Sequence, residues 1–112
     1  MTVDEEALLQ DMVDVIVREA DPDAIILFGS RARGDAGPDS DVDLLVIEKD
    51  DFSPQHSRRL AAGLLYRRLA GFGVAKDLLL YSADEVSRYK HSRNHLVARA
   101  LKEGRRLYER RT

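Results

Sequence analysis

The stretch FGSRARGDAGPDSDVDLLV, residues 28–46, contains most of the residues on which an interpretation of this chain depends. It begins where a short apolar run ends in Gly29 and Ser30, and it continues through a loop rich in Gly, Asp and Arg. A second apolar run follows, opened by Asp41 and Asp43. Small residues, arginines and paired carboxylates are the groups that a site for a nucleotide phosphate and a metal ion requires. The stretch therefore indicates such a site between two strands.

Helical and extended patterns alternate along the chain on both sides of this stretch. The predicted helices are Val3–Ala20, residues 30–33, residues 54–71, residues 83–89 and residues 96–103. The predicted strands are Ala24–Phe28, residues 41–47, residues 74–81 and a short edge strand at residues 105–108. This order indicates an α/β or α+β fold, with a sheet of three to four strands and helices packed mainly on one of its faces.

Polar residues and glycines predict where several helices begin and end. Helix starts are indicated by Thr2 with Glu5, by Ser53 with Pro54, and by Ser82 with Glu85. Gly104 is the expected C-cap of the last helix. The middle helix is expected to bury one face, made of Leu60, Ala61, Leu64, Leu65 and Leu69, and to expose its arginines to solvent.

The composition limits the class of protein. A chain of 112 residues with 44% hydrophobic and 34% charged residues fits one folded domain, which we expect to span residues 1–112. The absence of cysteine excludes disulfides and thiolate metal sites. The acidic N-terminus is unlike a signal peptide, and no apolar run approaches the roughly 20 residues of a membrane span. We therefore expect a cytoplasmic protein without a membrane partner.

Charge is distributed unevenly along the chain. Residues 1–51 hold 15 acidic and 4 basic residues, a net charge of −11, whereas residues 88–112 hold 9 basic and 2 acidic residues, a net charge of +7. The simplest interpretation is that the two ends neutralise each other across the fold. Tyr89 and Tyr108 are the only aromatic residues of the basic end, so we do not expect direct binding to nucleic acid.

Three aspartates are candidate metal ligands. Residues i and i+2 of a strand project from the same face, so Asp41 and Asp43 would present two carboxylates side by side. Asp77 lies inside an apolar run and would add a third carboxylate if its strand lies beside that of Asp43. Carboxylate oxygens suit Mg²⁺ or Mn²⁺. Each aspartate alone also fits a structural role, such as capping a strand or pairing with an arginine.

Gly29 and Ser30 are candidate phosphate ligands. Glycine lets the backbone approach a ligand closely, and the Ser30 hydroxyl can donate to a phosphate oxygen. Arg31 and Arg33 add positive charge beside them. Gly-Ser after a strand is also common in ordinary turns, so it is the combination with the aspartates that favours a site.

The combination resembles a known signature. Gly29-Ser30, ten further residues and Asp41-Val42-Asp43 are similar to the GS-x10-DxD motif of the DNA polymerase β-type nucleotidyltransferases. The full stretch most resembles the minimal nucleotidyltransferase (MNT) domains of that superfamily, antitoxins of HEPN/MNT toxin–antitoxin pairs. The ending HLVARALKEGRRLYER, residues 95–110, is also similar to the close of these domains. In that family the third carboxylate usually follows an aliphatic residue, whereas Lys76 precedes Asp77 here.

The resemblance implies a small mixed sheet with flanking helices, as in the polymerase β palm, and Mg²⁺-dependent transfer of a nucleoside monophosphate. By position, it implies that Gly29 and Ser30 hold the triphosphate of ATP, with help from Arg31 and Arg33. It also implies that the aspartates bind two Mg²⁺ ions, or Mn²⁺, and that one of them is the base. The implied metal ligands and catalytic residues are Asp41, Asp43 and Asp77, the last as base.

The resemblance further implies a HEPN-type toxin as partner, with AMP transferred to a tyrosine of that toxin in a type VII-like toxin–antitoxin system. Two other functions stay open. The chain could be a non-catalytic antitoxin that neutralises its toxin by binding, or a transferase for a small molecule such as an antibiotic, with a dimer building the acceptor site. The short chain, which leaves no room for an acceptor-binding domain, favours a protein acceptor.

Overall fold

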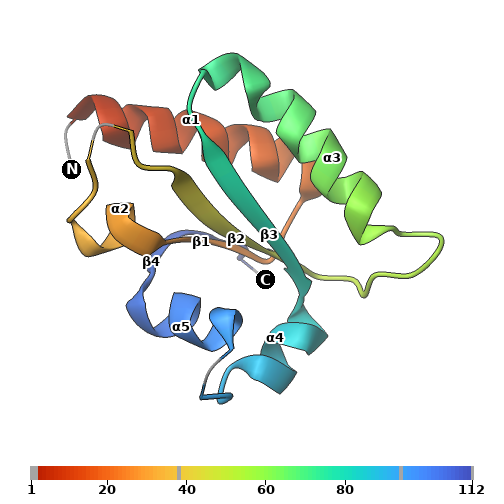
Figure 1. Ribbon diagram of the computed structural model, residues 1–112. Coiled ribbons are helices and arrows are strands. Elements are labelled where there is room, and N and C mark those ends of the chain that lie inside the picture. The colour runs from red at the N-terminus through yellow and green to blue at the C-terminus, as the bar shows by residue number, and fades with distance from the viewer. Residues whose placement is uncertain (1–2, 38, 94, 112) are drawn as a thin grey trace.

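A four-stranded mixed sheet runs through the middle of the molecule (Figure 1). The computed structural model describes residues 3–37, 39–93 and 95–111, so Thr2 of the predicted capping box lies outside the described residues. The strands are β1 (Ala24–Phe28), β2 (Val42–Glu48), β3 (Lys76–Ser82) and β4 (Arg105–Glu109), in the spatial order β3-β2-β1-β4. β2 pairs in parallel with β3, and the other two pairings are antiparallel. The predicted small mixed sheet, with its short edge strand, is confirmed.

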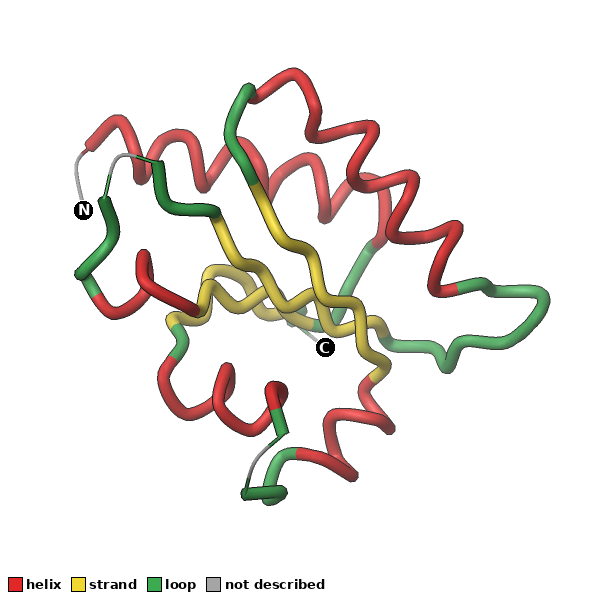
Figure 2. Tube along the Cα trace, viewed as in Figure 1, coloured by secondary structure: helices red, strands yellow, loops and turns green. Residues whose placement is uncertain are grey.

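Helices cover both faces of this sheet. They are α1 (Val3–Ala20), α2 (Gly29–Arg33), α3 (Arg58–Leu69), α4 (Ala83–Tyr89) and α5 (Leu96–Glu103), with a 3-10 turn at Ala70–Phe72. Figure 2 shows α1 and α3 on one side of the strands and α4 and α5 on the other. The expectation that helices pack mainly on one face was therefore wrong. No helix in the described part of the chain is long and apolar enough to cross a membrane.

Two apolar cores explain this arrangement. Alternate residues of β2 enter different cores: Leu44 and Val46 pack with α1 and α3, whereas Leu45 and Ile47 pack with α5. The first core holds four residues of α1, namely Leu9, Met12, Val13 and Ile16. The second core holds Val97 and Ala100 of α5. A central strand that is buried on both faces needs a nearly continuous apolar sequence, which β2 has.

The middle helix begins later than predicted. Ser53 forms a turn with His56 instead of capping a helix, and the N-cap is Ser57, whose hydroxyl accepts the Leu60 N–H at 3.3 Å. The predicted buried face is also partly wrong, because Leu60 is 74% exposed. The predicted capping box at Ser82 and Glu85 is confirmed by both of its hydrogen bonds.

Side chains of α3 cover the outer edge of β3. The Tyr66 hydroxyl accepts the Leu78 N–H at 2.9 Å, and the Arg58 guanidinium donates to the Leu80 carbonyl at 2.8 Å. Arg58 also pairs with Glu85 at 2.5 Å. The expectation that this arginine is simply solvated was wrong. These contacts satisfy backbone groups that an edge strand otherwise leaves open.

Ion pairs join the basic end of the chain to the acidic N-terminal part. Arg105 of β4 pairs with Glu6 of α1 at 2.8 Å, and Arg110 pairs with Asp21 at 2.7 Å. Arg110 also lies 3.3 Å from a carboxylate oxygen of Asp23. The charges of β4 and of the segment that follows it are thus neutralised across the fold, as predicted.

Gly104 offers a test of how closely α5 packs on β1. It caps α5 as predicted, but its φ is −81°, so the left-handed conformation does not explain the glycine. A Cβ at this position would overlap the carbonyl oxygens of Ala100 and Leu27. We expect Gly104→Ala to lower the free energy of unfolding by roughly 1–3 kcal/mol, measured by urea denaturation. Gly71→Ala is the control, because a Cβ there meets nothing within 4 Å, and an equal loss in both variants would contradict this packing.

Candidate functional site

The parallel pairing of β2 with β3 places two carboxylates side by side. Asp43 and Asp77 are each the second residue of their strand, and they are direct partners in the register. Paired strands lie about 4.8 Å apart, so both side chains leave the same face of the sheet as neighbours. On this face Asp43 is followed by Leu45 of the α5 core. The third strand thus lies beside the second, which was the condition for Asp77 to join the other two carboxylates.

Lys76 does not enter this face. Its register partner is Val42, which belongs to the core under α1 and α3. Because successive residues of a strand point to opposite faces, Lys76 and Asp77 project in opposite directions. The departure from the family pattern at position 76 thus leaves the carboxylate pair unaltered.

Electrostatics couple Asp43 to both other aspartates. Burial raises the pKa of Asp43 above its usual value, and the negative charges of Asp77 and Asp41 raise it further, while Arg33 opposes the rise. Asp41 is exposed and lies one residue before β2. A cation between like charges relieves this repulsion, so the donor set fits a hard divalent ion such as Mg²⁺.

The three carboxylates do not converge on a single metal position. Within residues 3–37, 39–93 and 95–111, no three carboxylate or imidazole groups converge on a point where they could hold one ion. Asp41 and Asp77 are both exposed, and exposed side chains change rotamer within nanoseconds. The backbone therefore fixes the pair Asp43 and Asp77, and binding of an ion by all three would require rotation of the exposed side chains.

Gly29 touches this carboxylate group from the end of β1. It begins α2 with a φ of +75°, a conformation that side chains with a Cβ rarely adopt. A Cβ here would overlap Oδ2 of Asp43. The predicted phosphate turn is thus in direct contact with one of the predicted metal ligands, Asp43. Ser30 follows in the same turn and is half-buried.

The two predicted arginines have different surroundings. The Arg31 guanidinium donates to the Ser40 carbonyl at 2.7 and 3.1 Å and lies 3.4 Å from Glu5, with only 12% of its side chain exposed. Arg31 therefore ties the loop after α2 to α1. Arg33 is exposed, lies 3.4 Å from Asp35, and acts on the charge of Asp43. Of the two, Arg33 is the one placed to meet a ligand at the carboxylates.

A cleft lined by Gly29 is also lined by Arg99, a cationic side chain that was not predicted as part of the site. The cleft has a volume of about 160 Å³, and Phe28, Gly29 and Arg33 line one side of it. Leu96 and Arg99 of α5 line the other side. Because Arg99 is separated from Arg33 by 66 positions in the sequence, only the packing of α5 beside α2 brings the two arginines to one cleft.

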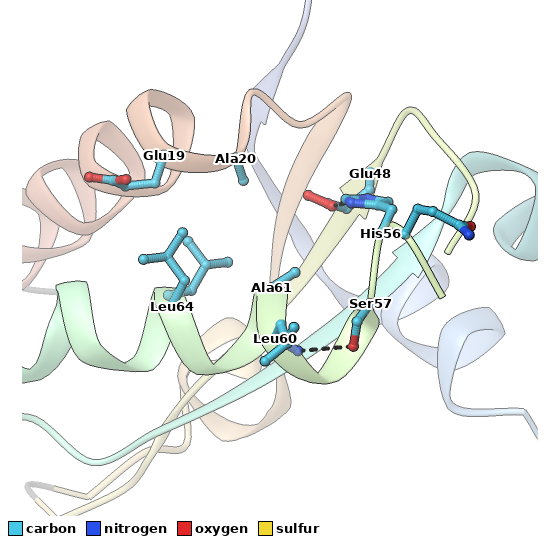
Figure 3. Close-up of a pocket in the computed structure, with 10 residues that line it drawn as sticks. Glu19, Ala20, Glu48, His56, Ser57, Leu60, Ala61 and Leu64 are labelled. Carbon is cyan, nitrogen blue, oxygen red and sulfur yellow. Dashed lines mark hydrogen bonds and ion pairs between the residues drawn. The ribbon is translucent and has the colours of Figure 1, made fainter. Parts of the chain in front are cut away.

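A second hollow lies away from the aspartates, between α1 and α3 (Figure 3). It has a volume of about 350 Å³ and is lined by Glu48 and His56, whose side chains lie 3.4 Å apart. Burial raises the pKa of Glu48, and His56 opposes the rise. Glu48 lies one residue beyond the predicted strand, but it is the last residue of β2 and only 5% exposed. This hollow brings together none of the predicted site residues.

Comparison with known proteins identifies the family. The sequence matches the polymerase beta nucleotidyltransferases over residues 10–112, so the chain belongs to this nucleotidyltransferase family. A search among curated proteins found no match.

Three solved structures share the fold. A candidate minimal nucleotidyltransferase is 28% identical, with a TM-score of 0.59, and the match covers 89% of this chain and 92% of that one. A candidate nucleotidyltransferase from Sulfolobus solfataricus is 20% identical, with a TM-score of 0.59 and coverage of 94% and 80%. A toxin–antitoxin complex solved with AMP-PNP is 20% identical, with a TM-score of 0.57 and coverage of 91% and 74%.

The contact between Gly29 and Asp43 can be tested by substitution. We expect Gly29→Ala to lower the free energy of unfolding by about 1–2 kcal/mol from backbone strain, with a further loss from the overlap with the carboxylate. Gly34→Ala is the matched control, because Gly34 has a φ of +84° but nothing within 4 Å of its Cβ position. Urea denaturation of both variants separates the two effects. Equal losses would show that Asp43 does not press on Gly29.

The raised pKa of Asp43 predicts a stability that depends on pH. A carboxyl that binds its proton more tightly in the folded chain makes the fold less stable as pH rises above the unfolded-state pKa, here about 3.8. Asp43→Asn removes this ionisation, so we expect a higher urea midpoint than wild type at pH 7 and a difference that shrinks toward pH 4. Asp51→Asn, at an exposed carboxylate, serves as control. A destabilised Asp43→Asn at pH 7 would contradict the electrostatic argument.

Proposed function

We propose that the chain is a Mg²⁺-dependent adenylyltransferase that moves AMP from ATP to a tyrosine hydroxyl of a partner toxin of the HEPN type. The observation that carries this proposal is the register of β2 with β3, which makes Asp43 and Asp77 neighbours on one face. The contact of Gly29 with Asp43 adds the phosphate turn to the same place. Membership of the nucleotidyltransferase family supports the reaction class.

The aspartates would hold the metal ions. In the proposal Asp41 and Asp43 bind two Mg²⁺ ions, and Asp77 is the third ligand. Such ions, when bound, neutralise the charge of a triphosphate and of the pyrophosphate that leaves it. The protein contributes a carboxylate pair whose mutual repulsion favours cation binding, together with a backbone that fixes two of the three ligands.

The reaction we propose is a displacement at the α-phosphorus of ATP. The oxygen of the acceptor hydroxyl forms a bond to this phosphorus, the bond to the bridging oxygen breaks, and pyrophosphate leaves. The hydroxyl proton passes to the carboxylate of Asp77, which is exposed and can reach an acceptor from solution. Gly29 and Ser30 hold the phosphates through the backbone and the hydroxyl, and Arg33 adds positive charge. Arg31 supports this turn from its position between the loop and α1.

The proposal of a protein acceptor is supported by the structural relatives of the chain. Two structural relatives are toxin–antitoxin complexes. One was solved with AMP-PNP, an ATP analogue, and the other, MntA–HpeT, carries two Asp-to-Glu substitutions. The latter is 15% identical to this chain, with a TM-score of 0.62. We propose the same kind of partner here, and a cytoplasmic location for the pair.

Transfer of label from ATP tests the proposal. The full chain is incubated with ATP labelled at the α-phosphate, Mg²⁺ and the toxin encoded by the adjacent gene, and incorporation into the toxin is measured. Loss of a general base typically slows a reaction by about 10²–10⁴-fold, so we expect Asp77→Asn to transfer at least a hundredfold more slowly while ATP binding is retained. Asp51→Asn, at an exposed residue three positions after the end of β2, should transfer at the wild-type rate.

Two outcomes would point to the other functions. If the wild-type chain transfers no label, and the double variant Asp41→Ala with Asp43→Ala still restores growth of cells that express the toxin, the chain neutralises its partner by binding alone. If label enters an aminoglycoside in place of the toxin, the acceptor is a small molecule. Either result would overturn the proposed acceptor.

A further inference from the structure

The positive charge of the basic end divides into two groups with different surroundings. The arginines of β4 and Arg110 face acidic residues, as described above. Five cations that come before β4 make no ion pair with any part of the chain that the structure describes. These unpaired cations are Arg88, Lys90, Arg93, Arg99 and Lys102. Direct ion pairs within the described part of the chain therefore do not account for them.

Four of these cations surround one hollow. The hollow has a volume of about 540 Å³ and lies between the loop after α4 and the outer side of α5. Its ionisable lining consists of Lys90, His91, Arg93, Arg99, Lys102 and one acid, Glu103. We refer to these six residues as the basic hollow. Like charges gathered around a concavity raise the local potential and attract an anionic ligand.

The loop that forms one wall of the basic hollow is held in place by an aromatic stack. The rings of Tyr89 and His95, on either side of the loop, lie parallel with centroids 4.0 Å apart. Tyr81 of β3 meets both rings edge-on, at 6.3 and 5.8 Å. The His95 ring nitrogen Nδ1 also accepts the Val97 N–H at 3.1 Å, at the start of α5. Lys90 and Arg93 are thus presented on a loop that is anchored to the sheet.

The basic hollow adjoins the candidate active site. Arg99 and Glu103 line both the hollow and the cleft next to Gly29. Because Gly29 touches Asp43, a chain bound in the hollow would extend past Arg99 toward the carboxylates. A molecule held there is therefore positioned relative to the reacting groups.

We propose that the basic hollow is the docking site for an acidic segment of the acceptor protein, which it holds beside the active site. This inference rests on the proposed function for the identity of the acceptor as a protein. It assigns recognition of the acceptor to residues far from the signature motif. Lys90, Arg93 and Lys102 would pair with carboxylates of the segment, and Arg99 would lie at the junction with the cleft.

The observations favour an acidic peptide over a nucleic acid. Proteins that bind single strands combine cations with aromatic platforms on which the bases stack. Apart from the His91 imidazole, the lining of the basic hollow contains no aromatic ring, and Tyr89 is already stacked on His95. The acidic first half of the chain would also repel a long polyanion, whereas a short peptide segment can avoid it.

Fluorescence anisotropy with a labelled deca-glutamate peptide tests the inference. The full chain is titrated into the peptide at 50 and 150 mM NaCl, without nucleotide or metal. We expect binding that weakens with salt, and an affinity at least about tenfold lower for the triple variant Lys90→Glu, Arg93→Glu and Lys102→Glu. The control variant carries Arg18→Glu, Arg59→Glu and Arg67→Glu, three exposed cations of α1 and α3. Both variants have the same net charge, so only the position of the reversed charges differs.

Three results would overturn the inference. These are no binding of the peptide by the wild-type chain, an equal loss in the control variant, or tighter binding of a labelled deca-uridine RNA than of the peptide. The assay contains no ATP, so it can fail while label transfer succeeds. Conversely, peptide binding with no label transfer would reject the proposed adenylyl transfer but not the proposed docking site. Both triple variants should bind ATP as the wild type does.

Discussion

The parallel pairing of β2 with β3 is the constraint on which the rest of the structure depends. Parallel neighbours cannot be joined by a tight turn, so the chain must leave the sheet after β2 and return to the end where β2 begins. The segment that makes this return contains α3, which therefore lies on a face of the sheet and packs beside α1. The same pairing sets the register that makes Asp43 and Asp77 neighbours. One backbone arrangement thus produces a layer of the fold and the carboxylate pair together.

The candidate site brings together carboxylates whose negative charges repel one another. Most of β2 is apolar and buried on both faces, but its second residue is a carboxylate that faces two others. Gly29 lies against this carboxylate in a left-handed conformation that glycine adopts readily and that other residues rarely adopt. The burial of Asp43 and its repulsion by the other carboxylates lower the stability of the isolated chain at neutral pH. Binding of a cation, as in the proposed function, would relieve this repulsion.

Much of the fold could be predicted from local pattern, and the misses have physical causes. Val3–Ala20 and the capping box at Ser82 were recognised because apolar spacing and hydrogen bonds within a few residues determine them. The start of α3 was missed because Ser53 and Ser57 are equivalent as caps in the sequence, and only the turn between Ser53 and His56 decides between them. The two-sided packing was missed although the unbroken run Leu44–Ile47 is typical of a strand with both faces buried.

For the site, the signature motif and Asp77 could be found from residue type and position. The contributions of Arg99 and the different roles of Arg31 and Arg33 depend on contacts between distant segments, for which a single sequence carries no signal.

The covered edge of β3 has a consequence for how a partner can bind. Many proteins recognise a partner by adding one of its segments to a sheet as an extra strand, which requires free backbone groups at an edge. At β3, Tyr66 and Arg58 already occupy the N–H of Leu78 and the carbonyl of Leu80. At the opposite edge, β4 presents Arg105, Arg106 and Glu109, and charged side chains discourage the addition of a strand. Recognition by backbone pairing is therefore disfavoured at both edges, and a partner must be selected by side chains on the helical faces.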